Sequence, residues 1–166
     1  MSRRGLTIRR GALSEGDWVT IPGPPVGKGR PRLVHGRVYT PARTRQWESV
    51  AKAIMRIGWS GPPIPKPVPV RVDIRQIEAR PKRFKGPDHR HWCPLGGAHP
   101  DVDNVVKLVL DSLNGLAYED DSQVCHPQPV KLWAASGESP RVEIRIATLD
   151  PDGPTPDDQL SLWGGG

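Results

Sequence analysis

The stretch from His99 to Gly115 reads HPDVDNVVKLVLDSLNG and carries the most regular helical pattern of the chain. Its polar residues recur at helical spacing, at Asn104, Lys107, Asp111 and Asn114. Val and Leu fill the rest of the circumference, which is typical of a largely buried helix. We therefore expect a helix over residues 104–113 with Asp103 near its N-cap, ended by the Asn-Gly pair that favours a helix stop.

Acidic residues lie on both sides of this helix. Asp101 and Asp103 project to the same side if the chain enters the helix in an extended conformation. After the helix, Asp120 and Asp121 follow a turn that could return them beside the first pair. Converging carboxylates repel one another unless a cation lies between them, and oxygen ligands favour Mg²⁺. The alternative is an Asp-rich turn in which Asp103 caps a helix and the later pair is solvated.

Around this helix the sequence predicts strands before, between and after two helices. The other helix is expected to begin with Thr40 as N-cap and Pro41 in its first turn. Its apolar stripe is predicted at Trp47, Val50, Ile54 and Ile57. Strands are predicted at 18–21, 70–75, 124, 130–133 and 141–146, with a hairpin at 33–39. This order indicates an α+β fold with a small mixed sheet.

The expected organisation is one domain with irregular ends. Residues 1–16 form a basic flexible arm, 17–149 the folded domain, and 150–166 an acidic, proline-rich tail. Residues 80–99 are predicted to be a long loop. Its three histidines and one cysteine lack a regular zinc spacing, so a zinc site is the less favoured alternative to an irregular loop.

Charge and composition narrow the class of protein. The 166-residue chain has a formal net charge of +6, and its four acids within 150–166 leave the remainder at +10, because no Lys or Arg lies in that tail. A basic body favours a polyanionic partner such as DNA. No apolar run long enough for a bilayer helix and no secretory signal are visible. With only two cysteines, we expect a cytoplasmic setting.

Taken together, these motifs resemble the RusA family of Holliday junction resolvases. The resemblance rests on HPDVDNVVKLVLDSLNG with EDDSQV at 119–124, and on IPGPPVGKGRPR at 21–32 with VYTPARTRQW at 38–47. It covers residues 18–146. It implies a RusA-like homodimer that cuts opposed strands of a four-way DNA junction with Mg²⁺, in a bacterial setting or in a phage or prophage.

The resemblance also implies roles for individual residues. The family's essential aspartates match Asp101, Asp103 and Asp121, its helical lysine matches Lys107, and Asp120 is a supporting acid. The expected catalytic group is therefore Asp101, Asp103, Asp121 and Lys107. The expected metal ligands are Asp101, Asp103, Asp120 and Asp121. A flap- or fork-selective nuclease and a non-catalytic module that binds branched DNA are the alternatives.

Two further segments predict contacts with partners. The basic loop and first helix supply candidate phosphate contacts at Lys28, Arg30, Arg32, Arg43 and Arg45. A solvated loop is the alternative for the first three. In the tail, residues 159–163 read QLSLW and resemble the short peptide by which bacterial replication proteins bind the sliding clamp. Its expected contacts are Gln159, Leu160, Leu162 and Trp163.

Overall fold

The structure is a computed structural model, and it describes residues 18–29, 32–34, 37–59, 61–84, 86–94 and 99–153. Within these residues the strands are β1 (Val19–Pro22), β2 (Arg32–Val34), β3 (Arg37–Tyr39), β4 (Val70–Glu78), β5 (His91–Trp92), β6 (Val124–Trp133) and β7 (Arg141–Thr148). The helices are α1 (Ala42–Gly58), α2 (Val102–Leu113) and the 3-10 turn η1 (Asp121–Gln123). The predicted arm at 1–16 and the peptide at 159–163 lie outside the described residues.

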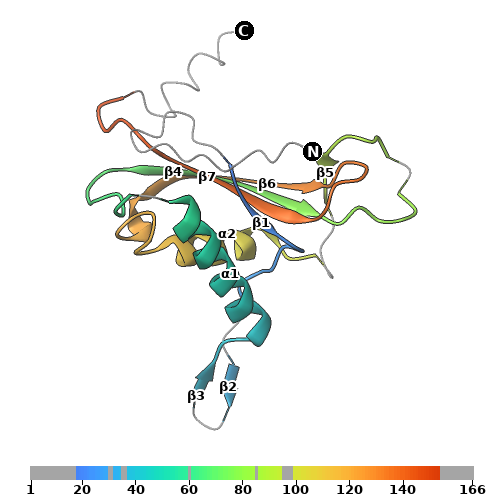
Figure 1. The fold of residues 1–166 in the computed structure, drawn as a ribbon, viewed down its shortest axis with the longest axis horizontal. Helices are drawn as coiled ribbons and strands as arrows, with labels where there is room; N and C mark the ends of the chain where they lie inside the picture. Colours follow the sequence, from blue (N-terminus) through green and yellow to red (C-terminus); the bar gives the residue numbers. More distant parts are fainter. Residues whose placement is uncertain are drawn as a thin grey trace.

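Five of the described strands form one mixed sheet in the order β1-β7-β4-β6-β5. β4 and β6 pair in parallel, whereas β1–β7, β4–β7 and β5–β6 are antiparallel. The parallel pair requires a crossover, and α2 lies within it (Figure 1). The predicted α+β class with a mixed sheet is thus confirmed. Neither described helix is long and apolar enough to cross a bilayer.

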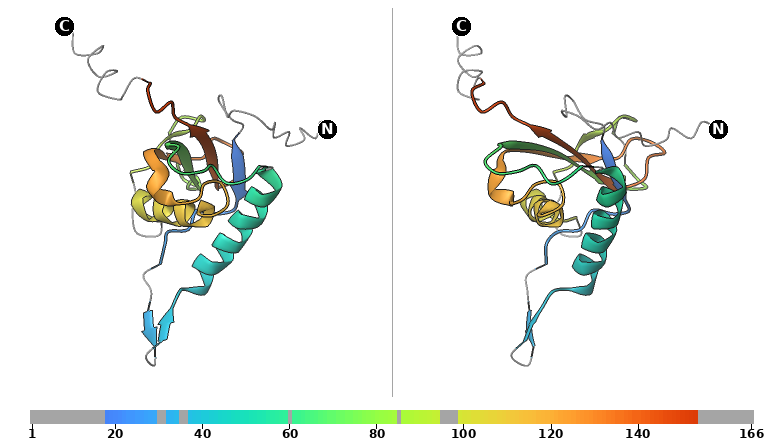
Figure 2. Two further views of the ribbon diagram at one scale, coloured as in Figure 1. Left: turned by 90° about the vertical axis from the view of Figure 1, so that its left-hand side faces the viewer. Right: turned by 60° about the vertical axis from the view of Figure 1, so that its left-hand side comes forward.

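Both helices cover the same face of the sheet (Figure 2). Alternation along β4 and β7 sends Val72, Ile74 and Ile144 into a core shared with the helices. The helix side of this core includes Met55 of α1 and Leu108 of α2, both buried. Residues of the opposite parity lie on the other face, which we call the open face of the sheet.

The first helix begins one residue later than expected and buries a different stripe. Pro41 is its N-cap, rather than a residue of the first turn. Trp47 is buried as expected, but Val50 and Ile57 are 40% and 78% exposed. The buried stripe contains small residues such as Ala51, which let α1 approach its neighbours closely. The expected stripe was therefore wrong for two of its four residues.

The predicted hairpin is confirmed by β2 and β3, which pair antiparallel with Leu33 opposite Val38. It lies beyond the N-terminal end of α1, away from the sheet (Figure 1). The region predicted as a long loop at 80–99 is only partly irregular, because β5 pairs with the end of β6. The two strand pieces predicted around Val124 and Lys131 are one continuous strand.

One edge of the sheet is formed by the first part of β6. β5 pairs only with Leu132 and Trp133, so the stretch before them has β4 as its one strand partner within the described residues. Pro127 and Pro129 lie in that stretch. A proline within a sheet must direct its nitrogen, which lacks a hydrogen, toward the free edge.

Candidate active site at the N-terminal end of α2

The N-terminal end of α2 presents two exposed carboxylates. Asp101 is the N-cap, with extended backbone (φ −68°, ψ 147°), and its side chain makes no capping hydrogen bond. Asp103 lies in the first turn, with its side chain 62% exposed. Asp103 thus lies near the N-cap, as expected, but the helix starts at Val102, so Asp103 belongs to its first turn and not to an extended lead-in. Both carboxylates nevertheless lie near helix N–H groups, where negative charge is favoured.

Two residues of the polar stripe of α2, Lys107 and Asp111, form ion pairs. Lys107 Nζ lies 3.4 Å from Asp103 Oδ2, one helical turn away, and the lysine side chain is 64% exposed. Further along the stripe, Lys28 of the basic loop forms an ion pair with Asp111. Val105, Leu108, Val109 and Leu113 of α2 are buried, each at 0% exposure, and its other apolar residues are half-buried. The stripe therefore remains accessible on a helix that is otherwise packed.

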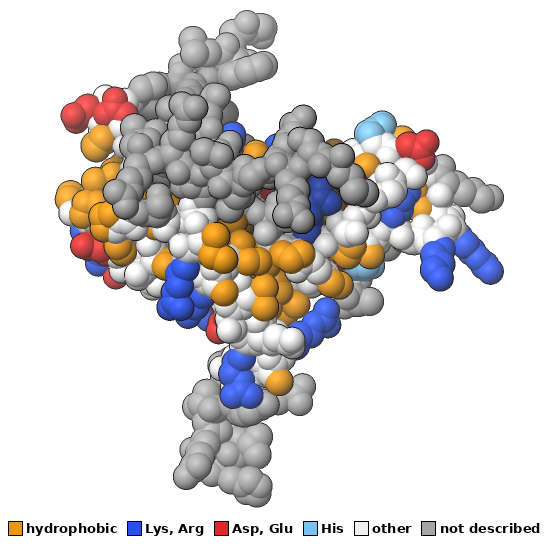
Figure 3. All heavy atoms as spheres, in the orientation of Figure 1, with side chains coloured by type: hydrophobic (Ala, Val, Ile, Leu, Met, Phe, Trp, Pro, Cys, Tyr) orange, Lys and Arg blue, Asp and Glu red, His pale blue; other side chains and the backbone are white. Residues whose placement is uncertain are grey.

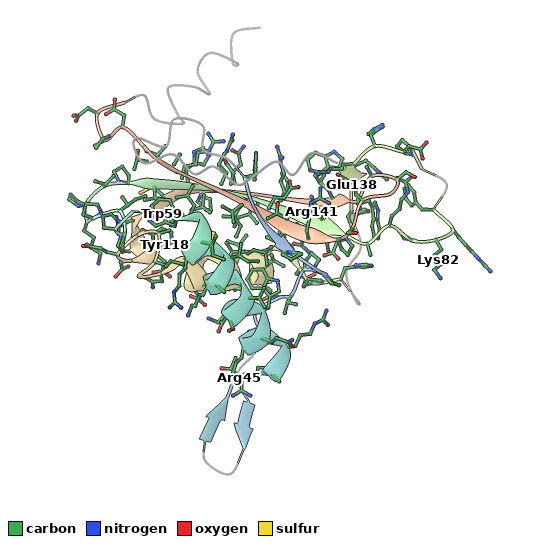
Figure 4. The ribbon with its side chains drawn as sticks, viewed as in Figure 1. Arg45, Trp59, Lys82, Tyr118, Glu138 and Arg141 are labelled. Atoms are coloured by element: carbon green, nitrogen blue, oxygen red, sulfur yellow. The ribbon has the colours of Figure 1, made fainter. Side chains whose placement is uncertain are left out.

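The basic loop is held against the start of α2. The Lys28 N–H donates to the Asn104 carbonyl over 2.9 Å. A Cβ at Gly27 would lie 3.1 Å from the side chains of Asn104 and Pro100, so glycine permits this close approach. Lys28 thus lies beside the acidic end of the helix. Arg43 and Arg45 are exposed on α1, and Arg45 lies toward the hairpin (Figure 4). Arg32 begins β2, and Arg30 lies outside the described residues.

A buried polar network holds the segment that precedes Asp101. Gln76 Nε2 donates to the Pro100 carbonyl over 2.8 Å and to Glu78 Oε1 over 2.6 Å. The other oxygen of Glu78 lies 3.0 Å from His99 Nδ1. Gln76 and Glu78 are 0% and 3% exposed, so the end of β4 anchors the lead-in to the site. The sequence reasoning missed this network; the signal was a pair of polar residues at core positions of β4.

Asp101 and Asp103 line an open hollow of about 520 Å³. Its lining combines acidic, basic and apolar side chains: Trp92, Cys93, Pro94, Asp101, Val102, Asp103, Pro129, Val130 and Lys131. The hollow lies between the start of α2 and the neighbouring strands β5 and β6. Cys93 lies on this lining, but the three histidines do not form a metal-binding group with it: among the described residues no such group of three or more is found, His99 pairs with Glu78 and His91 stacks on Phe84.

The other expected acids lie at the far end of α2. Asp120 is the N-cap of η1, where its carboxylate accepts from the Ser122 N–H over 2.9 Å. Lys66 Nζ donates to it over 2.8 Å, and this hydrogen bond holds the pKa of Asp120 well below its usual range. Asp121 is exposed beside it. Asp120 thus has a local structural role.

Folding of the connection explains why these acids do not return to Asp101. Gly115 has φ +71°, a conformation that favours glycine, and its N–H donates to the Tyr118 carbonyl over 2.8 Å. Tyr118 in turn donates its hydroxyl to the Leu110 carbonyl over 2.9 Å. Burial, and secondly the charge of Asp121, raise the pKa of this tyrosine. The connection is therefore fixed against the C-terminal part of α2.

The two acidic groups are separated by the length of the helix. The 12 residues of α2 span about 18 Å. In the described residues, no three or more His, Cys, Asp or Glu side chains form a group that could hold a metal ion. The expected return of Asp120 and Asp121 beside Asp101 and Asp103 is thus not found in the described residues of the single chain.

Comparisons with known proteins agree with this architecture. Residues 22–147 match the model of the family described as Endodeoxyribonuclease RusA. The chain is also 32% identical over 136 residues to "Uncharacterized protein YqaN" of Bacillus subtilis (strain 168), covering 76% of this chain and 92% of that protein. The matched region runs from the end of β1 to β7 and includes the acidic end of α2. On these grounds the chain belongs to the RusA family of endodeoxyribonucleases.

Proposed function

We propose that this chain resolves Holliday junctions by Mg²⁺-dependent hydrolysis of DNA phosphodiester bonds. The observation that supports it most directly is the pair of exposed carboxylates at the start of α2, in an open hollow of a basic protein. Membership of an endodeoxyribonuclease family supplies the reaction class. A junction has two opposed strands to cut, which suits two copies of one small subunit.

The residues present fit a magnesium ion. Mg²⁺ is commonly held by one or two carboxylates together with water and substrate phosphates, and Asp101 and Asp103 offer such a pair. When bound, the cation would help to activate water and to stabilise the charge on the scissile phosphate. Lys107 would keep the Asp103 carboxylate oriented and offset negative charge beside the phosphate.

Asp121 would complete this site from a second copy. In a two-fold dimer with α2 antiparallel to α2 of its partner, the start of one helix lies near the end of the other. Asp121 of the partner subunit would then approach Asp101 and Asp103, with Asp120 as a supporting acid. Two equivalent sites would result, separated by roughly the length of the helix.

The composite site is tested with mixed dimers. Asp103→Asn and Asp121→Asn homodimers should both lose cleavage. A purified heterodimer of the two variants should regain one intact site and nick a single strand of the junction. If each site lay within one protomer, both sites of the heterodimer would be damaged and no nicking would appear.

Phosphate contacts of the basic residues would supply affinity. Lys28 lies beside α2, and Arg43 and Arg45 are exposed on α1. Arg30 and Arg32 belong to the same basic segment of sequence. We propose that these five residues contact the DNA backbone, which gives binding that weakens as salt rises.

The main experiment offers end-labelled DNA to the purified protein with Mg²⁺ or with chelator. The substrates are a mobile four-way junction, a flap, a fork and a linear duplex. We expect symmetric cuts in the junction that need the cation and disappear in Asp103→Asn. Asp88→Asn is the matched control, because the Asp88 side chain is 94% exposed and does not line the hollow.

Other outcomes would contradict parts of the proposal. Preferred cutting of the flap or fork would overturn junction selectivity. Binding without cutting under all conditions would overturn the enzymatic function and favour a module that binds branched DNA. Equal cutting by wild type and Asp103→Asn would reject the assigned site.

The tail adds a proposed partner, the bacterial sliding clamp, through Gln159, Leu160, Leu162 and Trp163. The support is the sequence pattern alone, with an acidic, proline-rich lead-in typical of a tethered peptide. Capture of purified clamp should require residues 158–166. Equal capture by the truncated chain would overturn this contact without affecting the nuclease proposal.

A further inference from the structure

The large aromatic ring of Trp92 is exposed to solvent and takes no part in the hydrophobic core. Its side chain is 69% exposed. Its two neighbours in sequence pack into the protein instead, since His91 stacks on Phe84 with ring centroids 4.7 Å apart and Cys93 is buried. Successive side chains of a strand point to opposite faces, which places the Trp92 ring opposite that of His91. An exposed apolar ring at a strand edge favours unwanted association, so a binding role would account for it.

The ring lies at the hollow that contains the candidate catalytic carboxylates. Trp92 lines this hollow together with Asp101 and Asp103, and Lys131 lies on the same lining. The hollow thus combines a flat apolar surface, two metal-binding groups and a cation. One nucleotide is complementary to this combination, because its flat base and its anionic phosphate are joined through a single sugar. These features favour a nucleotide over an apolar protein segment as the occupant.

We propose that Trp92 is a specificity-determining residue that stacks on an unpaired base next to the scissile phosphate. This inference rests on the proposed function. In a continuous duplex both faces of each base are covered by neighbouring base pairs, so the ring has no face to contact. At a branch point a base can leave the stack and meet the indole. Stacking of one base on an aromatic side chain changes affinity by roughly 10- to 100-fold.

The other aromatic residues near the hollow do not provide this surface. Phe84, His91, His99 and Trp133 contact one another, with the His99 and Trp133 ring centroids 5.2 Å apart. Trp133 is 3% exposed. Among the described residues, Trp92 is thus the exposed aromatic ring on the lining of this hollow.

The test compares Trp92→Ala with Trp92→Phe, which keeps a stacking ring. Ile57→Ala is the matched control, since Ile57 is 78% exposed on α1. Each variant is assayed on a four-way junction and on a linear duplex of the same sequence. A 2-aminopurine base at the branch point reports stacking through its fluorescence. Binding is measured with chelator present, so that this readout is independent of cleavage.

We expect Trp92→Ala to lose roughly 10- to 100-fold of its junction affinity and cleavage, with duplex affinity unchanged. The 2-aminopurine should be brighter in that complex than with wild type. Trp92→Phe should retain most of the effect, and Ile57→Ala should match wild type.

Two results would overturn the inference while leaving the proposed function intact. In the first, all variants cut the junction equally and give equal 2-aminopurine signals. In the second, Trp92→Ala changes sedimentation from dimer to monomer, which would make the ring a contact between copies. Failure of the proposed function is distinguishable, because the wild-type protein itself would then not cut the junction.

Discussion

The carboxylates at the start of α2 differ sharply from those on the open face of the sheet. Asp101 and Asp103 lie in solvent, and Asp103 has one loose lysine contact. On the sheet, Asp73 is held by two arginines, each at 2.8 Å, and the Glu143 side chain is 9% exposed. An acid whose hydrogen-bonding capacity is filled by arginines stabilises the fold. An acid left exposed beside an open hollow is available for a ligand.

The open face is a connected network of opposite charges. Glu143 contacts Arg141 at 2.8 Å, Arg90 at 3.2 Å and Arg75 at 3.4 Å. Glu138 joins this network through Arg90 and Arg141, and Glu138 and Arg141 are labelled at the start of β7 (Figure 4). The Trp18 ring lies under Arg75, 3.8 Å from its guanidinium carbon. By contrast, the face that α1 crosses shows a group of hydrophobic side chains flanked by Lys and Arg (Figure 3).

The largest effect is expected from substitutions at the N-terminal end of α2, which should lower cleavage without lowering stability. Asp101→Asn and Asp103→Asn should each lower junction cleavage by roughly 100-fold or more, because a proposed metal ligand loses its charge. The free energy of unfolding should change by no more than about 0.5 kcal/mol, since both side chains are exposed. Single-turnover cleavage and urea unfolding measure the two quantities. A large loss of stability would contradict the contrast between the two regions.

Glu143→Gln should give the reverse pattern. Removing a buried charge leaves three arginines without their shared partner, and we expect a loss of about 2–4 kcal/mol in the free energy of unfolding. Cleavage by the folded fraction should remain near wild type. Urea unfolding measures this change, with Asp88→Asn as the exposed control. Unchanged stability together with lost cleavage would assign the sheet network to the active site instead.

Acid should weaken the network on the open face. Hydrogen bonds from Arg90 are the largest cause that holds the pKa of Glu138 below its ordinary value of 4.5. Because the folded-state pKa is depressed, this stabilisation is present above about pH 4.5 and is lost as pH falls through the folded-state pKa. Glu138→Gln should cost about 1 kcal/mol at pH 7, and the difference should shrink in acid. Unfolding curves at pH 7 and pH 3 test this; a constant difference would contradict it.

The smallest expected effect concerns the exposed pair of Lys28 and Asp111. Both side chains are 36% exposed, so Lys28→Ala should change stability by less than about 1 kcal/mol. If Lys28 contacts a phosphate, the slope of log affinity against log salt should fall by about one. Titrations of the junction at several salt concentrations measure the slope. An unchanged slope would make Lys28 a purely structural partner of α2.

Local patterns predicted the elements that depend on local physics. Alternation identified β7, and the apolar circumference with a polar stripe identified α2. The buried side of α1 was less predictable, because small residues such as Ala51 pack against neighbours that only the tertiary structure defines. Polar residues in the core, such as Gln76, were also missed, since their partners come from residues distant in sequence.

The site was predictable in its residue types but not in its assembly. The exposed positions of Asp101 and Asp103 agree with the predicted role, although the helix begins earlier than its capping pattern suggested. The placement of Asp121 depends on how the connection after α2 folds. Tyr118 holds that connection in place, because its hydroxyl donates a hydrogen bond to the Leu110 carbonyl. A turn of this kind gives no periodic signal in the sequence.

The prolines of β6 have a consequence for how this protein associates. A bare strand edge normally offers alternating donors and acceptors on which a foreign segment can extend the sheet. At Pro127 and Pro129 the donors are missing, so an incoming strand would leave carbonyl groups of its own unsatisfied. Extension of the sheet from one molecule to the next is therefore disfavoured at this edge. The protein can then be concentrated on DNA, its proposed substrate, with less risk of aggregation.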